Sequence, residues 1–155
     1  AVDTKATNLY GPVEAYAYVV VDGKKELSET YKLTIKANIV EDFSSMTVEQ
    51  KQQSPMLETK SVVDLGTIAT GKHLKGQIKV KNIGVNPLHI RRAYSADKQI
   101  VLKPCKAVKS GRTGTIQVDV NTQGRNPGKY SREVVIISND YEHSIQKVTL
   151  MWTIQ

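Results

Sequence analysis

Several residue types are scarce in this chain, and each scarcity excludes a class of structure. The 155 residues include one cysteine, Cys105, so no disulfide forms within the chain and no cysteine-rich zinc site is available. No apolar run approaches the ~18 residues that a membrane-spanning helix needs. The histidines His73, His89 and His143 have no second ligand at a recognised metal spacing, so the sequence predicts no metal site.

Motifs of catalysis and of cofactor binding are also missing. The sequence has no Gly-x-Ser-x-Gly elbow, no phosphate-binding loop and no dinucleotide fingerprint. Residues 119–124 imitate the opening of a calcium loop, but Tyr130 stands where that loop requires a glutamate. We therefore expect no catalytic residues and no cofactor, in a protein that is not an enzyme.

The chain does have a regular alternation of apolar and polar residues with a period of two, which predicts β-strands. The alternating segments are residues 31–39, 74–81, 88–91, 115–120 and 147–154. Residues 134–137 are apolar on both faces and suit a central strand. Short strands separated by turn residues indicate a sandwich or a barrel.

Some single residues and short segments carry their own expectations. Residues 45–53 are the one moderately helical stretch, and their glutamines together with Pro55 favour a polar linker instead. Asn82–Ile83–Gly84 is expected to reverse the chain, with Gly84 able to adopt a positive φ. Cys105 is expected to be a buried or half-buried structural thiol, and Trp152 a core residue.

The chain also resembles itself. Three segments near its start match three near its end, in the same order: 2–4 with 120–122, 18–21 with 134–137, and 33–39 with 148–154. Residues 1–43 are therefore interpreted as the last two strands of an incomplete module, and residues 44–56 as a linker. Residues 57–155 have the length of a complete immunoglobulin-like, seven-strand sandwich. The predicted fold class is all-β.

A lone two-stranded hairpin is only marginally stable in water, so the face that carries Tyr31, Leu33, Ile35 and Ile39 must be covered. Three arrangements could cover it. The native protein could be longer, the hairpin could dock on the complete module, or two chains could exchange hairpins. We expect docking or exchange in this chain.

The order of several glycine, proline and asparagine motifs resembles a known family. The matching residues are Leu65–Gly66–Thr67–Ile68, Gly71, Val80–Lys81–Asn82–Ile83–Gly84, Pro87–Leu88–His89–Ile90, Gly111, Gly114, Gly128 and Ile137–Ser138–Asn139. In this order they resemble a bacterial immunoglobulin-like envelope family known as domain of unknown function fifteen seventy-three. The resemblance covers residues 57–155, and residues 1–41 resemble the tail of a preceding copy.

The resemblance implies tandem sandwich modules without catalytic activity, exported through an upstream signal to the periplasm or cell surface, or secreted. Many members of the family carry a Cys-x-Cys pair after the Pro-Leu-x-Ile strand. Here residues 93–97 contain no thiol, so no metal or redox role of that pair is expected. The function expected is a non-catalytic structural or protein-interaction module of the bacterial cell envelope. Its expected partner is another envelope protein, or a second copy through hairpin docking or exchange.

One predicted interface is apolar. Val135, Ile137 and Met151 fall on the outer side of the strands at 134–137 and 147–153 and are candidates for a contact between modules or subunits.

The alternative function is anion binding, which the charge distribution favours. The formal net charge is +7, and residues 72–112 contain 11 basic residues against the single acidic residue Asp97. A field of one sign attracts acidic polysaccharides or lipid headgroups. The candidate contacts are Lys75, Lys79, Lys81, Arg91 and Arg92.

Two conditions limit the anion-binding hypothesis. In an immunoglobulin-like sandwich, consecutive strands such as 74–81 and 88–93 usually lie in opposite sheets, so these cations need not form one patch. No nucleic-acid-binding motif is present, and we expect no nucleic acid as a partner.

Overall fold

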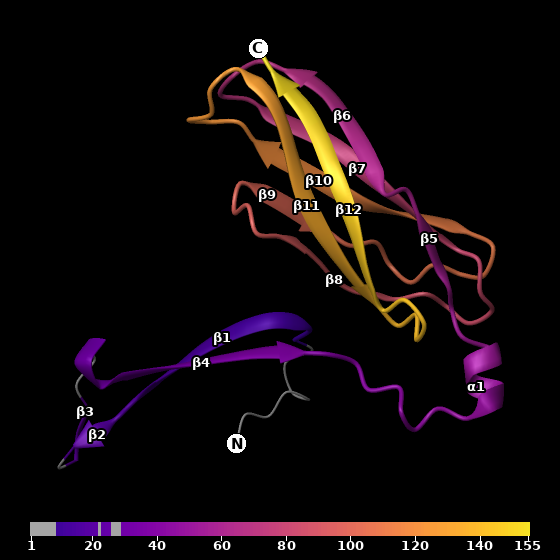
Figure 1. Ribbon diagram of the computed structural model, residues 1–155, viewed down its shortest axis with the longest axis horizontal. Coiled ribbons are helices and arrows are strands. Elements are labelled where there is room, and N and C mark those ends of the chain that lie inside the picture. The colour runs from indigo at the N-terminus through magenta and orange to yellow at the C-terminus, as the bar shows by residue number, and fades with distance from the viewer. Residues whose placement is uncertain (1–8, 22, 26–28) are drawn as a thin grey trace. The chain divides into compact units, whose positions relative to one another are not determined.

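The computed structural model describes residues 9–21, 23–25 and 29–155. The chain divides into two compact units, residues 1–41 and 42–155 (Figure 1). The repeat match at residues 2–4 lies outside the described residues, as does Asp22. The predicted all-β class is confirmed.

Unit 1 consists of short strands and one turn of 3-10 helix. Its elements are β1 (Gly11–Tyr18), β2 (Val20–Val21), β3 (Lys24–Lys25), η1 (Glu29–Tyr31) and β4 (Lys32–Ile39). β1 and β4 pair in antiparallel fashion, with Gly11 opposite Ile39 and Tyr18 opposite Lys32. The pair forms a two-stranded sheet of its own.

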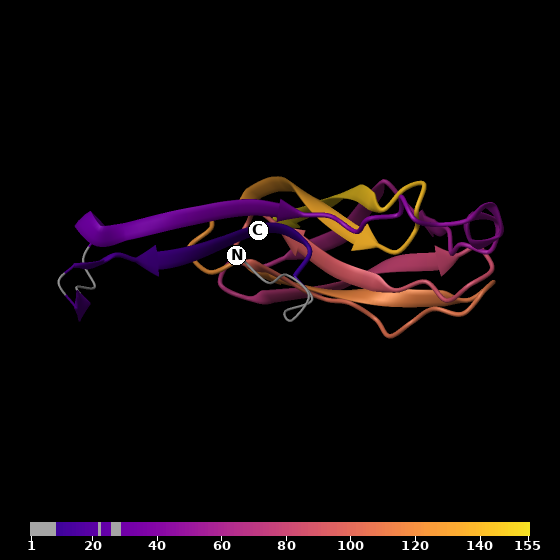
Figure 2. The ribbon, with the colours of Figure 1, turned by 90° about the horizontal axis from the view of Figure 1, so that it is seen from below.

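Unit 2 is a sandwich of two four-stranded sheets. Its elements are α1 (Val48–Gln52), β5 (Leu57–Thr59), β6 (Val62–Ile68), β7 (His73–Asn82), β8 (Ile90–Ser95), β9 (Ile100–Lys103), β10 (Thr113–Asn121), β11 (Gly128–Ser138) and β12 (Ile145–Ile154). One sheet has the order β5-β7-β10-β9 and the other β6-β12-β11-β8. Figure 2 shows the two sheets as separate layers.

The core lies between the two sheets, because alternate residues of each strand point inward. Trp152 is 2% exposed, and its ring stacks on Tyr130 with the ring centroids 5.5 Å apart. The expectation that Trp152 is a core residue is therefore confirmed. Ile78, Ile116 and Leu150 are fully buried in the same core.

The sandwich has eight strands, one more than expected, because residues 57–68 divide into two strands in opposite sheets. β5 pairs with β7, whereas β6 pairs with β12. The β6–β12 pairing is parallel, and the other strand pairings of unit 2 are antiparallel.

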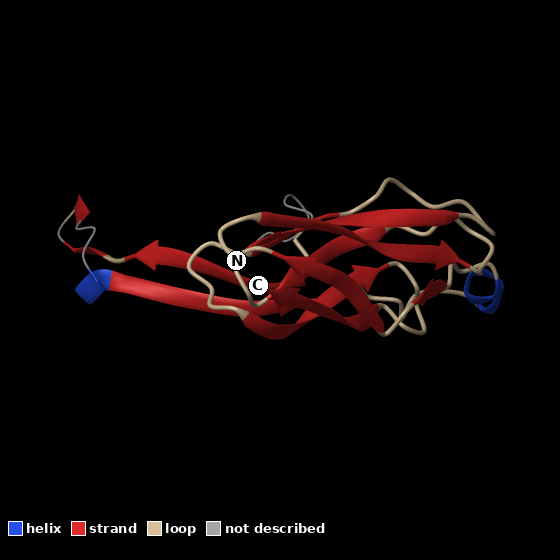
Figure 3. Ribbon diagram, turned by 90° about the horizontal axis from the view of Figure 1, so that it is seen from above, coloured by secondary structure: helices blue, strands red, loops and turns tan. Residues whose placement is uncertain are grey.

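The segment predicted to be a polar linker contains a helix. Thr47 caps α1 through a capping box, in which its side chain accepts from the Gln50 backbone N–H and the Gln50 side chain accepts from the Thr47 N–H. Figure 3 shows α1 beside an otherwise strand-rich fold. After the helix, Ser54 and Pro55 are buried. The reciprocal cap satisfies two backbone N–H groups and allows a helix of five residues.

The turn at Asn82–Ile83–Gly84 exists, but Gly84 is needed for a different reason than expected. It is not among the described glycines with a positive φ. A Cβ at Gly84 would lie 2.4 Å from the Ser54 carbonyl oxygen and 2.5 Å from the Met56 nitrogen. The close approach of the backbone at residues 54–56, rather than a left-handed conformation, requires glycine at this position.

Candidate binding surfaces

The two faces of the β1–β4 hairpin differ in chemistry. On one face every side chain is apolar, and we call this set the hairpin face: Val13, Ala15, Ala17, Leu33, Ile35, Ala37 and Ile39. Leu33 is 57% exposed and Ile35 42% exposed, so the described residues of unit 1 leave the face open. A continuous apolar surface of this kind favours contact with another apolar surface.

The opposite face of the hairpin is polar. The Tyr16 hydroxyl donates to Glu14 Oε1 at 2.5 Å, and Lys36 Nζ lies 3.8 Å from Glu14 Oε2. The Tyr16 hydrogen bond, followed by the nearby lysines, lowers the pKa of Glu14. Lys32 Nζ lies 4.1 Å from the Tyr16 ring centroid. The hairpin therefore has one face that suits water and one that does not.

The β1–β4 hairpin has the same register as the β11–β12 hairpin of unit 2. Gly11 pairs with Ile39 at the open end of one, and Gly128 pairs with Ile154 at the open end of the other. Aligned in this way, Leu33 and Ile35 take the positions of two fully buried residues of β12, Val148 and Leu150. The hairpin face thus corresponds to the side of β11–β12 that faces the sandwich core.

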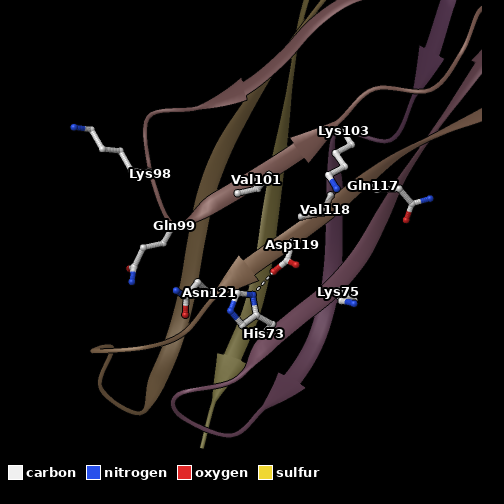
Figure 4. Close-up of a pocket in the computed structure, with 10 residues that line it drawn as sticks. All are labelled: His73, Lys75, Lys98, Gln99, Val101, Lys103, Gln117, Val118, Asp119 and Asn121. Atoms are coloured by element: carbon white, nitrogen blue, oxygen red, sulfur yellow. Dashed lines mark hydrogen bonds and ion pairs between the residues drawn. The ribbon is translucent and has the colours of Figure 1, made fainter.

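A second surface is a pocket of about 490 Å³ on the outer face of β7, β10 and β9 (Figure 4). Its lining is mostly basic and polar: His73, Lys75, Lys98, Gln99, Val101, Lys103, Gln117, Val118, Asp119 and Asn121. His73 Nδ1 lies 2.7 Å from Asp119 Oδ1, and both side chains are partly exposed.

The structure separates the five basic residues that were proposed as anion contacts. Lys75, Lys79 and Lys81 lie together on the exposed face of β7. Lys81 Nζ is 3.6 Å from Glu58 Oε2. Arg91 and Arg92 lie on β8, which belongs to the other sheet. The five residues therefore do not form one patch.

The three candidates for an apolar interface lie on the outer side of β11 and β12 but offer limited surface. Met151 is 43% exposed, Val135 is half-buried, and Ile137 is only 3% exposed. Val135 is paired with Lys147, whose Nζ lies 3.1 Å from Glu133 Oε1. The charged side chains of Lys147 and Glu133 therefore lie among the apolar residues on this face.

A partly buried ionic cluster was not predicted from the sequence. Asp97 Oδ2 accepts from Arg125 Nη2 at 2.7 Å and from Arg132 Nε at 3.0 Å. The Arg125 guanidinium lies over the rings of Tyr130 and Trp152, at 5.4 and 5.7 Å from their centroids. Because these residues are far apart in the sequence, no local motif indicates the cluster.

Three further features limit the chemistry of the described residues. The described residues contain no group of three metal-ligating side chains close enough to share an ion. None of the helices formed by the described residues is long and apolar enough to cross a membrane. Cys105 is a free thiol and, as expected, half-buried; a Cβ at Gly114 would lie 2.7 Å from its Sγ.

The sequence of this chain matches the model of a known domain family. The profile of the HYDIN/CFA65/VesB-like Ig-like domain matches residues 55–151, well over half of the chain. The chain belongs to this Ig-like family. The matched residues include the pocket and the outer faces of both sheets, whereas the β1–β4 hairpin precedes this Ig-like domain.

Solved structures resemble this chain, and the first of them shares its fold. A protein of unknown function from Porphyromonas gingivalis W83 aligns with 95% of this chain and 67% of its own, at 17% identity and a TM-score of 0.68. The Vibrio cholerae VesB protease aligns with 64% of this chain and 31% of its own, at 13% identity and a TM-score of 0.48. PapD-like domain 7 of human CEP192 aligns with 77% of this chain and 95% of its own, at 11% identity and a TM-score of 0.47.

The Porphyromonas likeness extends beyond the Ig-like domain. Residues 1–41 make up about a quarter of the chain, so a match over 95% of it includes most of unit 1. The fold of the hairpin therefore recurs, together with the Ig-like domain, within a longer chain. No curated protein sequence matches this chain significantly.

Proposed function

We propose that the protein is a non-catalytic protein-interaction module of the bacterial cell envelope and that the hairpin face is its contact surface. The observation that carries the proposal is the arrangement of unit 1, in which one face of two paired strands carries only apolar side chains and leaves Leu33 and Ile35 exposed. The Ig-like family and the resemblance to a bacterial envelope family support this role. Ig-like sandwiches present faces and strand edges to other proteins.

The register of the hairpin supports a β-sheet as the occupant of the hairpin face. In unit 2 the equivalent side of β11–β12 packs against the sheet β5-β7-β10-β9. Three of the side chains on the hairpin face are alanines, which project little from the strands, so a second sheet can pack at the usual separation of ~10 Å. When this chain is alone in solution, the hairpin of a second copy provides a sheet with the same apolar face. We therefore expect two hairpin faces to pack against each other.

The size of the hairpin face limits the strength of such a dimer. Two strands of eight residues, at ~3.4 Å per residue and ~4.8 Å between strands, present a face of roughly 27 by 10 Å. A stable interface buries about 800 Å² per partner. The hairpins alone therefore predict a weak dimer whose population depends on protein concentration.

Self-association of the full chain tests this proposal. We expect analytical ultracentrifugation to show a dimer that grows with concentration, and Ile35→Lys to abolish it by placing a charge in the contact. Thr34→Lys adds the same charge to the polar face and is the matched control, expected to leave the dimer intact. A chain that stays monomeric up to millimolar concentration, or two variants that behave alike, contradicts the proposal.

Cell fractionation tests the envelope assignment. In the native bacterium we expect the protein in the periplasmic, cell-surface or secreted fraction. Recovery with a cytosolic marker enzyme contradicts the assignment. This test is independent of the hairpin contact, so one part of the proposal can fail without the other.

A further inference from the structure

The pocket on β7, β10 and β9 lies on unit 2 and plays no part in the proposed hairpin contact. We propose that this pocket binds an acidic glycan, with Lys75 and Lys103 holding its carboxylate or sulfate groups and Gln117 bonding its hydroxyls. Figure 4 shows these side chains around the pocket.

The strand register places the two lysines on opposite sides of the pocket. Gln117 on β10 pairs with Lys103 on β9, and Asp119, two residues further along β10, pairs with Lys75 on β7. Lys75 and Lys103 are thus separated by two strand spacings, about 10 Å, and by two residues along the strands, about 7 Å. Two cations spaced in this way suit an extended ligand that carries an anionic group at intervals.

The polar groups that would meet the ligand are available. Among the residues that the structure describes, Lys75, Lys103 and Gln117 have no hydrogen-bonding or ion-pair partner for their side chains. Lys81, on the same face, is already paired with Glu58. An ammonium group without a counter-ion in a partly enclosed hollow attracts anions more strongly than a neutralised one.

One carboxylate also lines the pocket. Asp119 Oδ1 is held by His73 Nδ1 at 2.7 Å, toward the end of the pocket formed by β7 and β10. The lining contains Lys75, Lys98 and Lys103 against Asp119, so its formal charge is +2 when His73 is neutral. Asp119 lies opposite Lys75 on the neighbouring strand, so we expect the anionic groups of the ligand to meet the ammonium groups of Lys75 and Lys103 from the solvent side of the pocket.

The remaining side chains favour a glycan over other polyanions. Val101 is 53% exposed and gives the pocket a small apolar floor, while Gln77, Thr115 and Lys79 extend the polar face along the sheet. β7, β9 and β10 contain no Phe, Tyr or Trp on which nucleic-acid bases could stack. Nor do they expose a group of large apolar side chains that would enter a lipid layer.

Calorimetric titration of the full chain tests the proposal. The probes are a heparin hexasaccharide and a hexamer of galacturonic acid, with maltohexaose as the neutral glycan. We expect both acidic probes to bind and maltohexaose to bind at least tenfold more weakly. We expect Lys75→Gln and Lys103→Gln each to weaken acidic binding about tenfold, equivalent to about 1.4 kcal/mol.

Matched variants separate a built site from net charge. Lys129→Gln removes the same charge from an exposed residue of β11, in the opposite sheet, and should change affinity less than twofold. Gln117→Leu keeps the charge and should weaken binding several-fold. Ile35→Lys should leave glycan binding unchanged, so failure of the hairpin contact and failure of the glycan site are distinguishable.

Several results would overturn the glycan site. They are no heat of binding with either acidic probe, an equal loss in Lys129→Gln, or no loss in Gln117→Leu. Binding to vesicles of phosphatidylglycerol without binding to the acidic hexamers would assign the pocket to a lipid surface instead. Melting curves that match the parent chain establish that each variant is folded before it is titrated.

Discussion

At the scale of single residues, Asp97 connects more of unit 2 than its position in a surface loop suggests. Its carboxylate accepts hydrogen bonds from the side chains of Arg125 and Arg132 and from the backbone N–H of Gln99. The Asp97 side chain is 13% exposed. Burial alone raises the pKa of Asp97, but the hydrogen bonds from Arg125, Gln99 and Arg132 outweigh it, so the pKa is lowered from 3.8. The cluster ties the loop before β9 to the loop before β11.

Asp97→Asn is expected to lower the free energy of unfolding by about 3 kcal/mol, because it leaves the buried guanidinium of Arg125 without a counter-charge. Urea denaturation at neutral pH measures this loss. Asp64→Asn, which changes an exposed carboxylate on β6, is the control and should cost less than ~1 kcal/mol. Equal losses in the two variants would show that the ionic cluster adds nothing.

The stability difference between the parent chain and Asp97→Asn should depend on pH. A carboxyl whose pKa is lower in the folded state stabilises the fold fully above its unfolded pKa, and this contribution is lost as the pH falls through the folded value. Denaturation at a series of pH values should therefore show the difference constant above pH ~5 and shrinking below pH ~4. A difference that grows on acidification contradicts the assignment.

Gly84→Ala is expected to destabilise unit 2 by about 2–3 kcal/mol, because the new Cβ meets backbone atoms at Ser54 and Met56 that cannot rotate away. Gly71→Ala is the comparison, since Gly71 has a φ of 75° and open space around it. Strain alone should cost about 1–2 kcal/mol there. If Gly71→Ala is the more damaging of the two in thermal denaturation, the close approach is not what selects glycine at position 84.

At the scale of elements, one buried carboxylate attaches β5 to the sandwich. Asp140, 1% exposed in the β11–β12 turn, accepts from the backbone N–H of Leu57 at 2.9 Å. It also accepts from the N–H groups of Glu142 and His143. β5 has only three residues and one neighbouring strand, so this hydrogen bond adds to the few that hold it, among them the bond from Gln146 Nε2 to the Leu57 carbonyl oxygen.

Asp140→Ala is expected to free β5 locally and to lower overall stability by about 3 kcal/mol, since three backbone N–H groups lose their acceptor. Amide hydrogen exchange should show faster exchange at Leu57, Glu142 and His143 than in the parent chain. Exchange at Trp152, in the middle of the core, should change only by the global loss of stability. Unchanged protection at Leu57 would contradict the tether.

The elements that the sequence predicts are those whose signal lies within the strand itself. The alternation in residues 74–81 and 147–154 sets both the strands and their buried faces, because the period of two is local. α1 was not predicted, since its cap at Thr47 is one polar pair among many glutamines. The pocket was not predicted either, because Val101 and Lys103 reach Gln117 only when β9 pairs with β10, which the order of the chain does not reveal.

At the scale of the whole molecule, two units of different character share one chain. Unit 2 has a core with many fully buried side chains, whereas no residue of the hairpin face is fully buried. Stability in a small domain comes mainly from buried apolar area. We therefore expect the two units to unfold separately, with unit 2 the more stable.

The single tryptophan allows this separation to be measured. Trp152 belongs to unit 2, so its fluorescence reports the unfolding of the sandwich and does not report the unfolding of the hairpin. Ile35→Lys should leave the fluorescence transition within ~0.5 kcal/mol of the parent value, as for independent sites. A larger shift would mean that the hairpin contributes to the stability of the sandwich.

The parallel pairing of β6 with β12 has a consequence for how the protein is made. β6 is synthesised early, whereas β12, the strand that pairs with it, is the last strand of the domain. Val62 therefore cannot pair with Thr149 until Thr149 has left the ribosome. Pairing over so long a stretch of sequence is slow. Until translation has passed β12, β6 lacks its partner strand, and we expect the nascent chain to be most prone to aggregation in this interval.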